Sequence, residues 1–398
     1  MNNSKLDLKH ILYLLGFCCY LINIFLNQSM FFANDNGYVN FFTKIFLFSI
    51  VLFSLGIKII FFDGFSIKEI TVFLFVLICF VISGIKSDNR QLITLFALIV
   101  SAKNINFKYV LRVYLFLIIS LLFLSFLFST ILEIIPNLQY TRVRDGVDKV
   151  RNSFGLSYPT VFAAYLQSIV VAYSYLMDNK KIYNHIFLLC LSMINVYICL
   201  EYADARMAAY SIVCYIFIYY FSSVFFKNIA NSRSLIILGM LIYPLAFAII
   251  FYLSYYYDST NDKFEIINSL LSGRLKLGHD ALINYGITIF GQKIEFIGLG
   301  GAVQSMTEDY NYVDSSFLKF LLSYGAVFSI ISILVMVYLS YNRFILGDYK
   351  FIAIIFIISL NAMIEDRMLD ISITPYWVIV MSFYFYGDIN GKRQKCKV

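Results

Sequence analysis

The residues of this chain best suited to chemistry are its arginines, most of which stand in polar breaks between apolar runs. Arg142, Arg144 and Arg151 share one break. Arg206 opens an apolar run, and Arg274 lies in the longest break. A guanidinium is planar and permanently charged, so it binds phosphate or carboxylate through two parallel hydrogen bonds. The set predicts a site for an anionic ligand, with salt bridges to nearby acids as the alternative.

A second set of residues could move a proton. Histidine is the residue type suited to general base catalysis at neutral pH, so His279 is a candidate base, although a solvated surface histidine is the plainer interpretation. Asp314 precedes an apolar run, where helix capping alone would explain it. Glu365 is a further candidate, but with the next two residues it could form a self-neutralised turn. Lys319 stands inside an apolar run, so it must face a cavity or reach the interface.

Composition decides the class of protein that carries these residues. The chain has 398 residues, of which 61% are hydrophobic and 14% charged. Soluble domains are nearer ~25% charged, so this chain cannot cover a water-exposed surface and is predicted to be a polytopic membrane protein. The net charge of +7 then reflects topology rather than nucleic-acid binding. Seven cysteines without a C-x-x-C pair predict neither disulfides nor a zinc site.

Apolar runs predict about twelve transmembrane helices, with the fourth and eleventh short enough to be tilted or re-entrant. The first follows a short basic segment without a cleavage site, which indicates an uncleaved helix. A 22-residue loop separates Pro136 from Pro159. The predicted helices are roughly 10–27, 40–57, 69–85, 89–102, 110–135, 158–177, 185–202, 207–226, 235–257, 316–341, 351–364 and 371–386.

The basic residues predict the orientation of these helices. With both termini in the cytoplasm, thirteen of the twenty lysines fall inside, as the positive-inside rule requires. The chain then divides into helices one to nine (1–257), a large extracellular loop (258–316), and helices ten to twelve with a basic tail (317–398). Seven of the eleven arginines fall outside, against that rule: Arg90, Arg142, Arg144, Arg151, Arg206, Arg274 and Arg367.

The large loop is expected to contain short helices. Ser272–Ile289 alternates apolar and polar groups at roughly helical spacing, which predicts an amphipathic helix on the membrane surface. The glycine-rich stretch 298–301 lacks the strand, helix and lysine of a phosphate-binding loop, so it is interpreted as a turn.

Six short motifs carry a resemblance to a known family. In this order, and with the long external loop, they resemble the Wzy-type oligosaccharide repeat-unit polymerases of Gram-positive capsule and exopolysaccharide clusters, which are related to O-antigen polymerases and ligases. The resemblance covers residues 140–386. The motifs are R-N-S-F-G-L-S-Y-P-T at 151–160, D-A-R-M-A-A-Y at 204–210, S-G-R-L-K-L-G at 272–278, Y-G-I-T-I-F-G-Q at 285–292, D-S-S-F at 314–317 and S-Y-G at 323–325.

The resemblance implies an all-α, GT-C-like glycosyltransferase in the plasma membrane of a Gram-positive bacterium. It would polymerise undecaprenyl-pyrophosphate-linked oligosaccharides, used as both donor and acceptor, on the outer face. A chain-length regulator is a further expected partner, and neither a cofactor nor a metal is expected. Arg206 stands where the family commonly has a Ser-Arg pair, although Ala205 replaces the serine.

The resemblance also implies roles for the candidate residues. Charge develops on the pyrophosphate as it leaves, and fixed cations that stabilise it lower the barrier. Catalytic roles are expected for Arg206, Arg274, His279 and Glu365, and substrate or pyrophosphate binding for Arg142, Arg144, Arg151, Lys319 and Asp314. The large loop is expected to close as a lid that supplies Arg274 and His279.

Two alternatives remain open. A ligase that transfers finished glycan to another acceptor would share the fold and the arginines. A lipid-linked oligosaccharide flippase or other transporter would have charges near mid-membrane and internal repeats, and no repeat is visible in this sequence.

Overall fold

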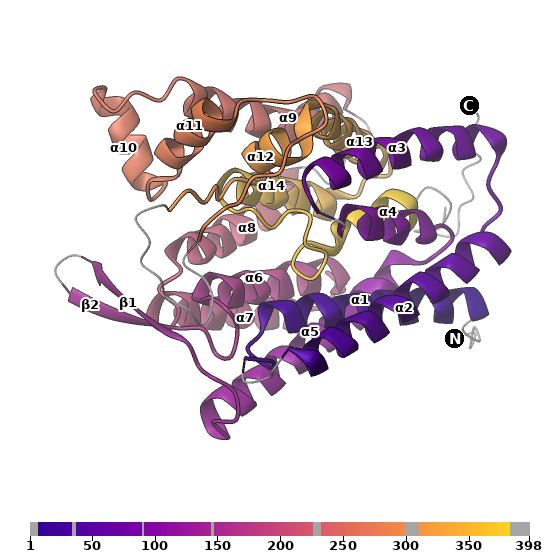
Figure 1. The fold of residues 1–398 in the computed structure, drawn as a ribbon, viewed down its shortest axis with the longest axis horizontal. Helices are drawn as coiled ribbons and strands as arrows, with labels where there is room; N and C mark the ends of the chain where they lie inside the picture. The colour runs from indigo at the N-terminus through magenta and orange to yellow at the C-terminus, as the bar shows by residue number, and fades with distance from the viewer. Residues whose placement is uncertain are drawn as a thin grey trace.

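The computed structural model describes residues 7–33, 37–89, 91–144, 147–225, 232–298 and 310–382, and its regular structure is nearly all helical (Figure 1). Within these ranges, nine helices are long and apolar enough to cross a membrane, which confirms a polytopic membrane protein in outline. They are α1 (Leu8–Gln28), α2 (Tyr38–Phe61), α3 (Ile67–Lys86), α5 (Phe107–Phe126, continued by a π-helical turn Leu127–Ile131), α6 (Pro159–Leu176), α7 (Ile182–Glu201), α8 (Arg206–Phe225), α9 (Arg233–Tyr255) and α12–α13 (Ser316–Ile345).

Two of the predicted spans form shorter helices, as expected from their length. They are α4 (Gln91–Ser101) and α14 (Tyr349–Ile364). The twelfth predicted span, 371–386, is described up to Ser382, and that part is not a long helix. It contains a 3-10 turn (Pro375–Val378) and one helical turn, α15 (Ile379–Ser382), and its remainder lies outside the described residues.

The packing of the helices separates a central element from lipid-facing ones. Of the 18-residue apolar stretch of α6, 83% is buried inside the protein. The corresponding share is 22% in α2 and in α3. Small residues such as Ala163 and Ala164 let other helices approach α6 closely. The exposed side chains of α2 include Phe42, Phe46 and Phe53, an apolar surface suited to lipid. Helix α6 is therefore the central helix of the bundle, and α2 and α3 lie at its outer surface.

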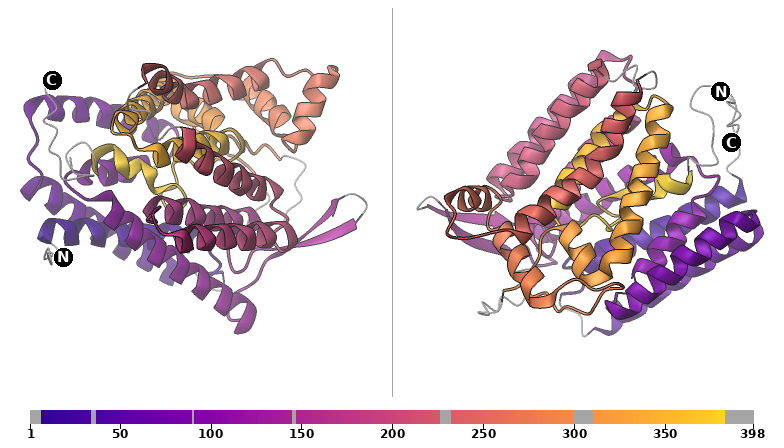
Figure 2. Two further views of the ribbon diagram at one scale, coloured as in Figure 1. Left: turned by 180° about the vertical axis from the view of Figure 1, so that it is seen from behind. Right: turned by 90° about the horizontal axis from the view of Figure 1, so that it is seen from above.

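One end of the bundle gathers the candidate residues, and we call it the site end. The Ser157 amide donates to the Gln28 carbonyl at 2.8 Å, which joins the start of α6 to the end of α1. The Asn152 amide donates to the Tyr202 carbonyl at 2.8 Å, next to the turn between α7 and α8. Figures 1 and 2 show the hairpin, α10 (Asp262–Leu270) and α11 (Arg274–Tyr285) at this same end.

The opposite end of the bundle is closed by lysines. Lys58 Nζ lies 2.5 Å from Asp63 Oδ2 and donates to the Lys103 carbonyl at 3.0 Å. Lys350 donates to the Met177 carbonyl at 2.7 Å and so satisfies a carbonyl at the end of α6. Lysine serves here as a cap and ion-pair partner.

The segment between α5 and α6 corrects a sequence prediction. Helix α5 and its π-helical turn end at Ile131, before Pro136, and the expected loop contains an antiparallel hairpin. Strand β1 (Gln139–Arg144) pairs with β2 (Val147–Asn152), and Arg144 stands opposite Val147. Asp-Gly at 145–146 between two such segments is a strong hairpin signal that the loop prediction overlooked.

The large loop is fastened to a break in the tenth span. Helix α12 (Ser316–Lys319) passes through a π-helical turn (Phe320–Tyr324) before α13 (Gly325–Ile345) begins. The extended segment 288–292 inserts at this break: the Gln292 amide donates to the Ser323 carbonyl at 3.0 Å, and the Ala326 amide to the Thr288 carbonyl at 2.9 Å. Two of the motifs noted in the sequence, 285–292 and 323–325, therefore lie in contact.

The expected amphipathic helix is present as α11.

Candidate functional site

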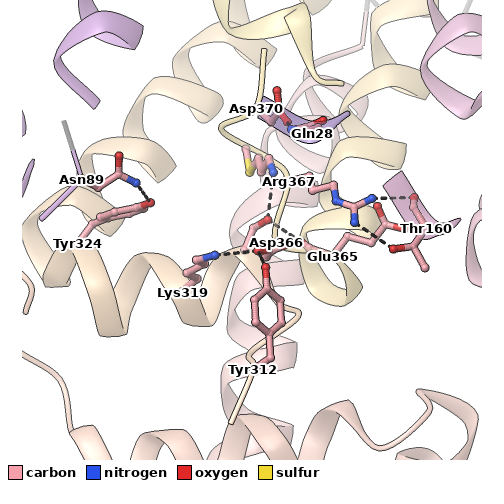
Figure 3. A network of polar contacts seen from close by, with 12 residues as sticks. Gln28, Asn89, Thr160, Tyr312, Lys319, Tyr324, Glu365, Asp366, Arg367 and Asp370 are labelled. Atoms are coloured by element: carbon pink, nitrogen blue, oxygen red, sulfur yellow. Dashed lines mark hydrogen bonds and ion pairs between the residues drawn. The ribbon is translucent and has the colours of Figure 1, made fainter. Parts of the chain in front are cut away.

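The centre of the candidate site is an ion pair between two helices. Lys319 Nζ, at the end of α12, lies 2.7 Å from Asp366 Oδ2, just beyond α14 (Figure 3). The Tyr312 hydroxyl donates to the same carboxylate oxygen. Lys319 also lies over the Tyr312 ring, 5.2 Å from its centroid. A carboxylate thus neutralises the lysine that the sequence placed inside an apolar run.

The residues that follow Asp366 tie this ion pair to the rest of the bundle. Arg367 donates to the Thr160 carbonyl at 2.7 Å and to its hydroxyl at 3.0 Å, at the start of α6 (Figure 3). Asp370 accepts a hydrogen bond from the Gln28 side chain at the end of α1. The segment 365–370 therefore connects α1, α6, α12 and α14.

A second ion pair comes from the large loop. Arg274 Nε, at the start of α11, lies 3.3 Å from Asp314 Oδ2, and Arg274 Nη1 donates to the Leu271 carbonyl at 3.2 Å. Arg274 and Asp314 both interact electrostatically with Glu365. We call this set of seven residues the charge cluster: Arg274, Asp314, Lys319, Glu365, Asp366, Arg367 and Asp370.

The two ion-paired carboxylates of the cluster differ in their pKa. Burial alone would raise the pKa of Asp366, but the Lys319 ammonium and the Arg367 guanidinium hold it below its usual range. Burial raises the pKa of Asp314, and the Arg274 guanidinium opposes that effect without offsetting it. Asp366 is therefore the more firmly ionised partner, and Asp314 takes up a proton more readily.

Two further arginines lie beside the turn between α7 and α8. Arg206 Nε lies 3.7 Å from Asp204 Oδ1, and 31% of its side chain is exposed. Arg151, in β2, donates to the Ala203 carbonyl at 3.1 Å and to the Tyr158 hydroxyl at 3.2 Å. Arg151 is buried, whereas Arg206 remains accessible to a ligand.

Tyr310 links these arginines to the charge cluster. Its phenol interacts electrostatically with Tyr158 on one side and with Arg274 and Asp314 on the other. Burial, followed by the Asp314 carboxylate, raises the pKa of Tyr310 to about 12. The phenol is therefore a neutral hydrogen-bond donor at neutral pH.

His279 lies in α11 but is held by a neighbouring helix. Its Nδ1 is 2.9 Å from the Ser254 carbonyl, near the end of α9, and its ring packs against Tyr257 with centroids 5.7 Å apart. A carbonyl oxygen only accepts, so Nδ1 must carry the hydrogen, and Nε2 is the free acceptor in the neutral ring. This contact positions α11 on α9, a role that the sequence interpretation of His279 as a base did not include.

Glu365 stands at the edge of a small cavity. The cavity is lined by α6, α14 and residues between 365 and 376, and its volume of about 40 Å³ is enough to admit water. Gln167 and Asn361 face it and bond to each other, with Asn361 Nδ2 3.1 Å from Gln167 Oε1. Arg367 also lines it.

The predicted site residues thus fall into distinct groups. Arg274, Asp314, Lys319 and Glu365 meet in the charge cluster, while Arg151 and Arg206 lie in the neighbouring group. His279 instead contacts Ser254 and Tyr257, near the end of α9. Arg142 and Arg144 belong to β1, but their side chains lie outside the described residues.

From the sequence, Arg367 counts among the external arginines, but no site role was assigned to it, to Asp366 or to Asp370. Four charged residues within six positions, three of them acids, between two apolar runs were the signal that could have revealed them. Tyr312 and Gln28 gave no such signal, because their roles depend on contacts between distant segments. Among the described residues, no three His, Cys, Asp or Glu side chains gather as a metal site would require.

Comparisons of the chain with protein-family models, with curated proteins and with solved structures found no match. The arrangement described above therefore stands on its own as evidence about function.

Proposed function

We propose that this protein is a membrane glycosyltransferase that polymerises undecaprenyl-pyrophosphate-linked oligosaccharide repeat units. One observation carries the proposal. Five cations from distant parts of the chain gather at the site end of a membrane bundle: Arg151, Arg206, Arg274, Lys319 and Arg367.

The proposed reaction uses these cations at the leaving group. The acceptor hydroxyl oxygen attacks the anomeric carbon of the donor, and the bond from that carbon to the pyrophosphate oxygen breaks. The electron pair passes to the pyrophosphate, whose growing charge Arg206 and Arg274 stabilise. The polyprenyl chain would remain in the lipid around the bundle.

Asp314 is the proposed acceptor of the hydroxyl proton. It is paired with Arg274 in the free protein. A bound pyrophosphate competes for that guanidinium and leaves the carboxylate free to take the proton. Its raised pKa favours this transfer.

The competing functions differ in their products. A ligase would transfer the glycan to a different acceptor and form no ladder from repeat units alone. A transporter is expected to carry charges near the middle of its spans, whereas this cluster lies at the ends of α11, α12 and α14. The polymerase is therefore the function that we favour.

The test uses full-length protein in lipid nanodiscs with lipid-linked repeat units. A polymer ladder is expected without nucleotide sugar. Arg206→Ala and Arg274→Ala should each slow its formation by about 10²–10³-fold, as for loss of one group that stabilises transition-state charge. Arg112→Ala is the matched control, because Arg112 is exposed on α5 beside Tyr109, away from the site end. A ladder unchanged by both site variants would refute the assignment of the arginines.

A further inference from the structure

The charge cluster does not balance. It contains four carboxylates (Asp314, Glu365, Asp366 and Asp370) and three cations (Arg274, Lys319 and Arg367), so 4 − 3 leaves one negative charge over. Asp314 pairs with Arg274, and Asp366 pairs with Lys319. Arg367 therefore faces two remaining carboxylates, Glu365 and Asp370. A buried charge without a counterion is unfavourable, which favours uptake of one proton.

Hydrogen bonding distinguishes the two remaining carboxylates. Asp370 accepts from the Gln28 amide, from the Ser372 amide nitrogen at 2.9 Å and from the Ser372 hydroxyl at 2.6 Å. Donors of this kind stabilise the ionised form. In the described part of the chain, the Glu365 carboxylate has no hydrogen-bond donor and no basic nitrogen within 4.0 Å. Glu365 is therefore the better place for the proton.

The surroundings of Glu365 point the same way. From the neighbouring elements it faces Arg367, Asp366, Arg274 and Asp314, and from α7 it faces the Cys199 thiol. Across the cavity, the 3-10 turn Pro375–Val378 contributes Tyr376, while α6 and α14 contribute the neutral Gln167 and Asn361. Lys319 is already paired with Asp366. Burial raises the pKa of Glu365 and also that of Asp370, so the hydrogen bonds to Asp370 are what distinguish the two carboxyls.

We infer that Glu365 and the cavity beside it form a proton-binding site, in which Glu365 is a neutral carboxylic acid. Its deprotonation is a simple titration, in which a carboxylic acid gives a carboxylate and one released proton. That carboxylate would add a negative charge beside Arg274 and Arg367 and weaken their hold on an anion. Glu365 then limits function at high pH and is not the general base, in contrast to the role expected from the sequence.

Infrared difference spectroscopy on the full-length protein in nanodiscs tests the proton site without any substrate. A C=O stretching band of a protonated carboxylic acid, shifted in D₂O, should be present at neutral pH and disappear as pH is raised. The band should be absent in Glu365→Gln and retained in Asp370→Asn. A band that Asp370→Asn removes and Glu365→Gln retains, or no band at neutral pH, would overturn the proposal.

The consequence for catalysis rests on the proposed function and is measured separately. Glu365→Gln should retain at high pH a larger fraction of its own neutral-pH polymerisation rate than the wild type does, because it has no carboxyl to ionise beside Arg274 and Arg367. A rate that is about 10²–10⁴-fold lower at every pH, as expected for loss of a general base, would overturn the assignment of Glu365 as a proton-binding acid. If no variant or wild type forms polymer, the proposed function fails while the infrared result still decides the proton site.

Discussion

The ion pair between Lys319 and Asp366 lies at the centre of the charge cluster. Each is largely buried, with side-chain exposures of 22% and 12%, and each satisfies the other at 2.7 Å. Removing one partner leaves a charge without compensation, whereas removing both leaves none. The pair therefore contributes more to the integrity of the site than its net energy suggests.

Lys319→Met should lower the free energy of unfolding toward the lower end of the ~3–5 kcal/mol typical of a broken buried pair, because Asp366 is left uncompensated. The double variant Lys319→Met/Asp366→Asn should recover much of that loss. Thermal unfolding can be followed by fluorescence of Trp377, the chain's one tryptophan, whose Nε1 donates to the Met368 carbonyl at 2.8 Å. Equal losses in the single and double variants would show that the charge left behind is not the cause.

Glu365 also makes the stability depend on pH. A carboxyl whose pKa is higher in the folded than in the unfolded chain stabilises the fold fully below the unfolded pKa. That contribution is lost as the pH rises through the pKa that Glu365 has in the folded chain. The melting temperature of the wild type should therefore fall relative to that of Glu365→Gln as pH rises above about 4.3, the ordinary pKa of glutamate. A constant difference between their melting temperatures at all pH values would contradict this prediction.

At the scale of elements, the broken tenth span holds the large loop against the bundle. Gly291 and Gly325 meet where segment 288–292 enters the break, both with φ near +90°. A Cβ on Gly291 would lie 2.1 Å from the Ser323 carbonyl oxygen, and one on Gly325 would lie 2.3 Å from the Gly291 nitrogen. These atoms belong to the backbone, so they cannot move aside without opening the junction.

Gly291→Ala and Gly325→Ala should each destabilise the protein by at least ~1–3 kcal/mol, from the positive φ alone. They should also make residues 286–298 more sensitive to limited proteolysis, because the loop would detach from α13. Gly56→Ala in α2 is the control, since a Cβ there meets nothing within 4 Å and favours the helix by up to ~1 kcal/mol. If the loop variants melt like Gly56→Ala, the junction does not hold the loop.

At the scale of the whole molecule, the two ends of the bundle differ in chemistry. Arg151, Arg206, Arg274, Lys319 and Arg367 lie at the site end. Lys58, Lys103 and Lys350 close the other end, which also holds their partners Asp63 and Glu69 and the Arg343–Asp348 ion pair. Lysine-rich ends usually remain in the cytoplasm. We therefore predict that the site end faces outward.

Cysteine labelling in intact cells can measure this orientation. In a variant without native cysteines, a membrane-impermeant maleimide should label Lys263→Cys in α10 but not Lys180→Cys between α6 and α7. Both lysines are exposed, so accessibility alone does not separate them. Labelling of position 180 and protection of position 263 would reverse the topology and refute an extracellular reaction.

The sequence by itself determined the class of protein and most of its helices. Apolar runs of membrane-spanning length leave few other structures open, because every backbone polar group must be satisfied within the bilayer. The same local reasoning identified Arg274, Asp314, Lys319 and Glu365 as candidates. It missed the pairing of β1 with β2, because the sequence signal Asp-Gly at 145–146 was interpreted as part of a loop.

Only the tertiary structure decided which of these charges meet. Arg274 and Asp314 are forty residues apart, and Lys319 and Asp366 are forty-seven residues apart. Lys319 reaches Asp366 because the tenth span begins with the short helix α12, next to the end of α14. Arg274 reaches Asp314 because the large loop packs α11 against α9. Charge balance and hydrogen bonding are properties of such neighbourhoods rather than of residue types. For that reason Glu365, a plausible base in the sequence, becomes in the folded chain a carboxyl that binds a proton.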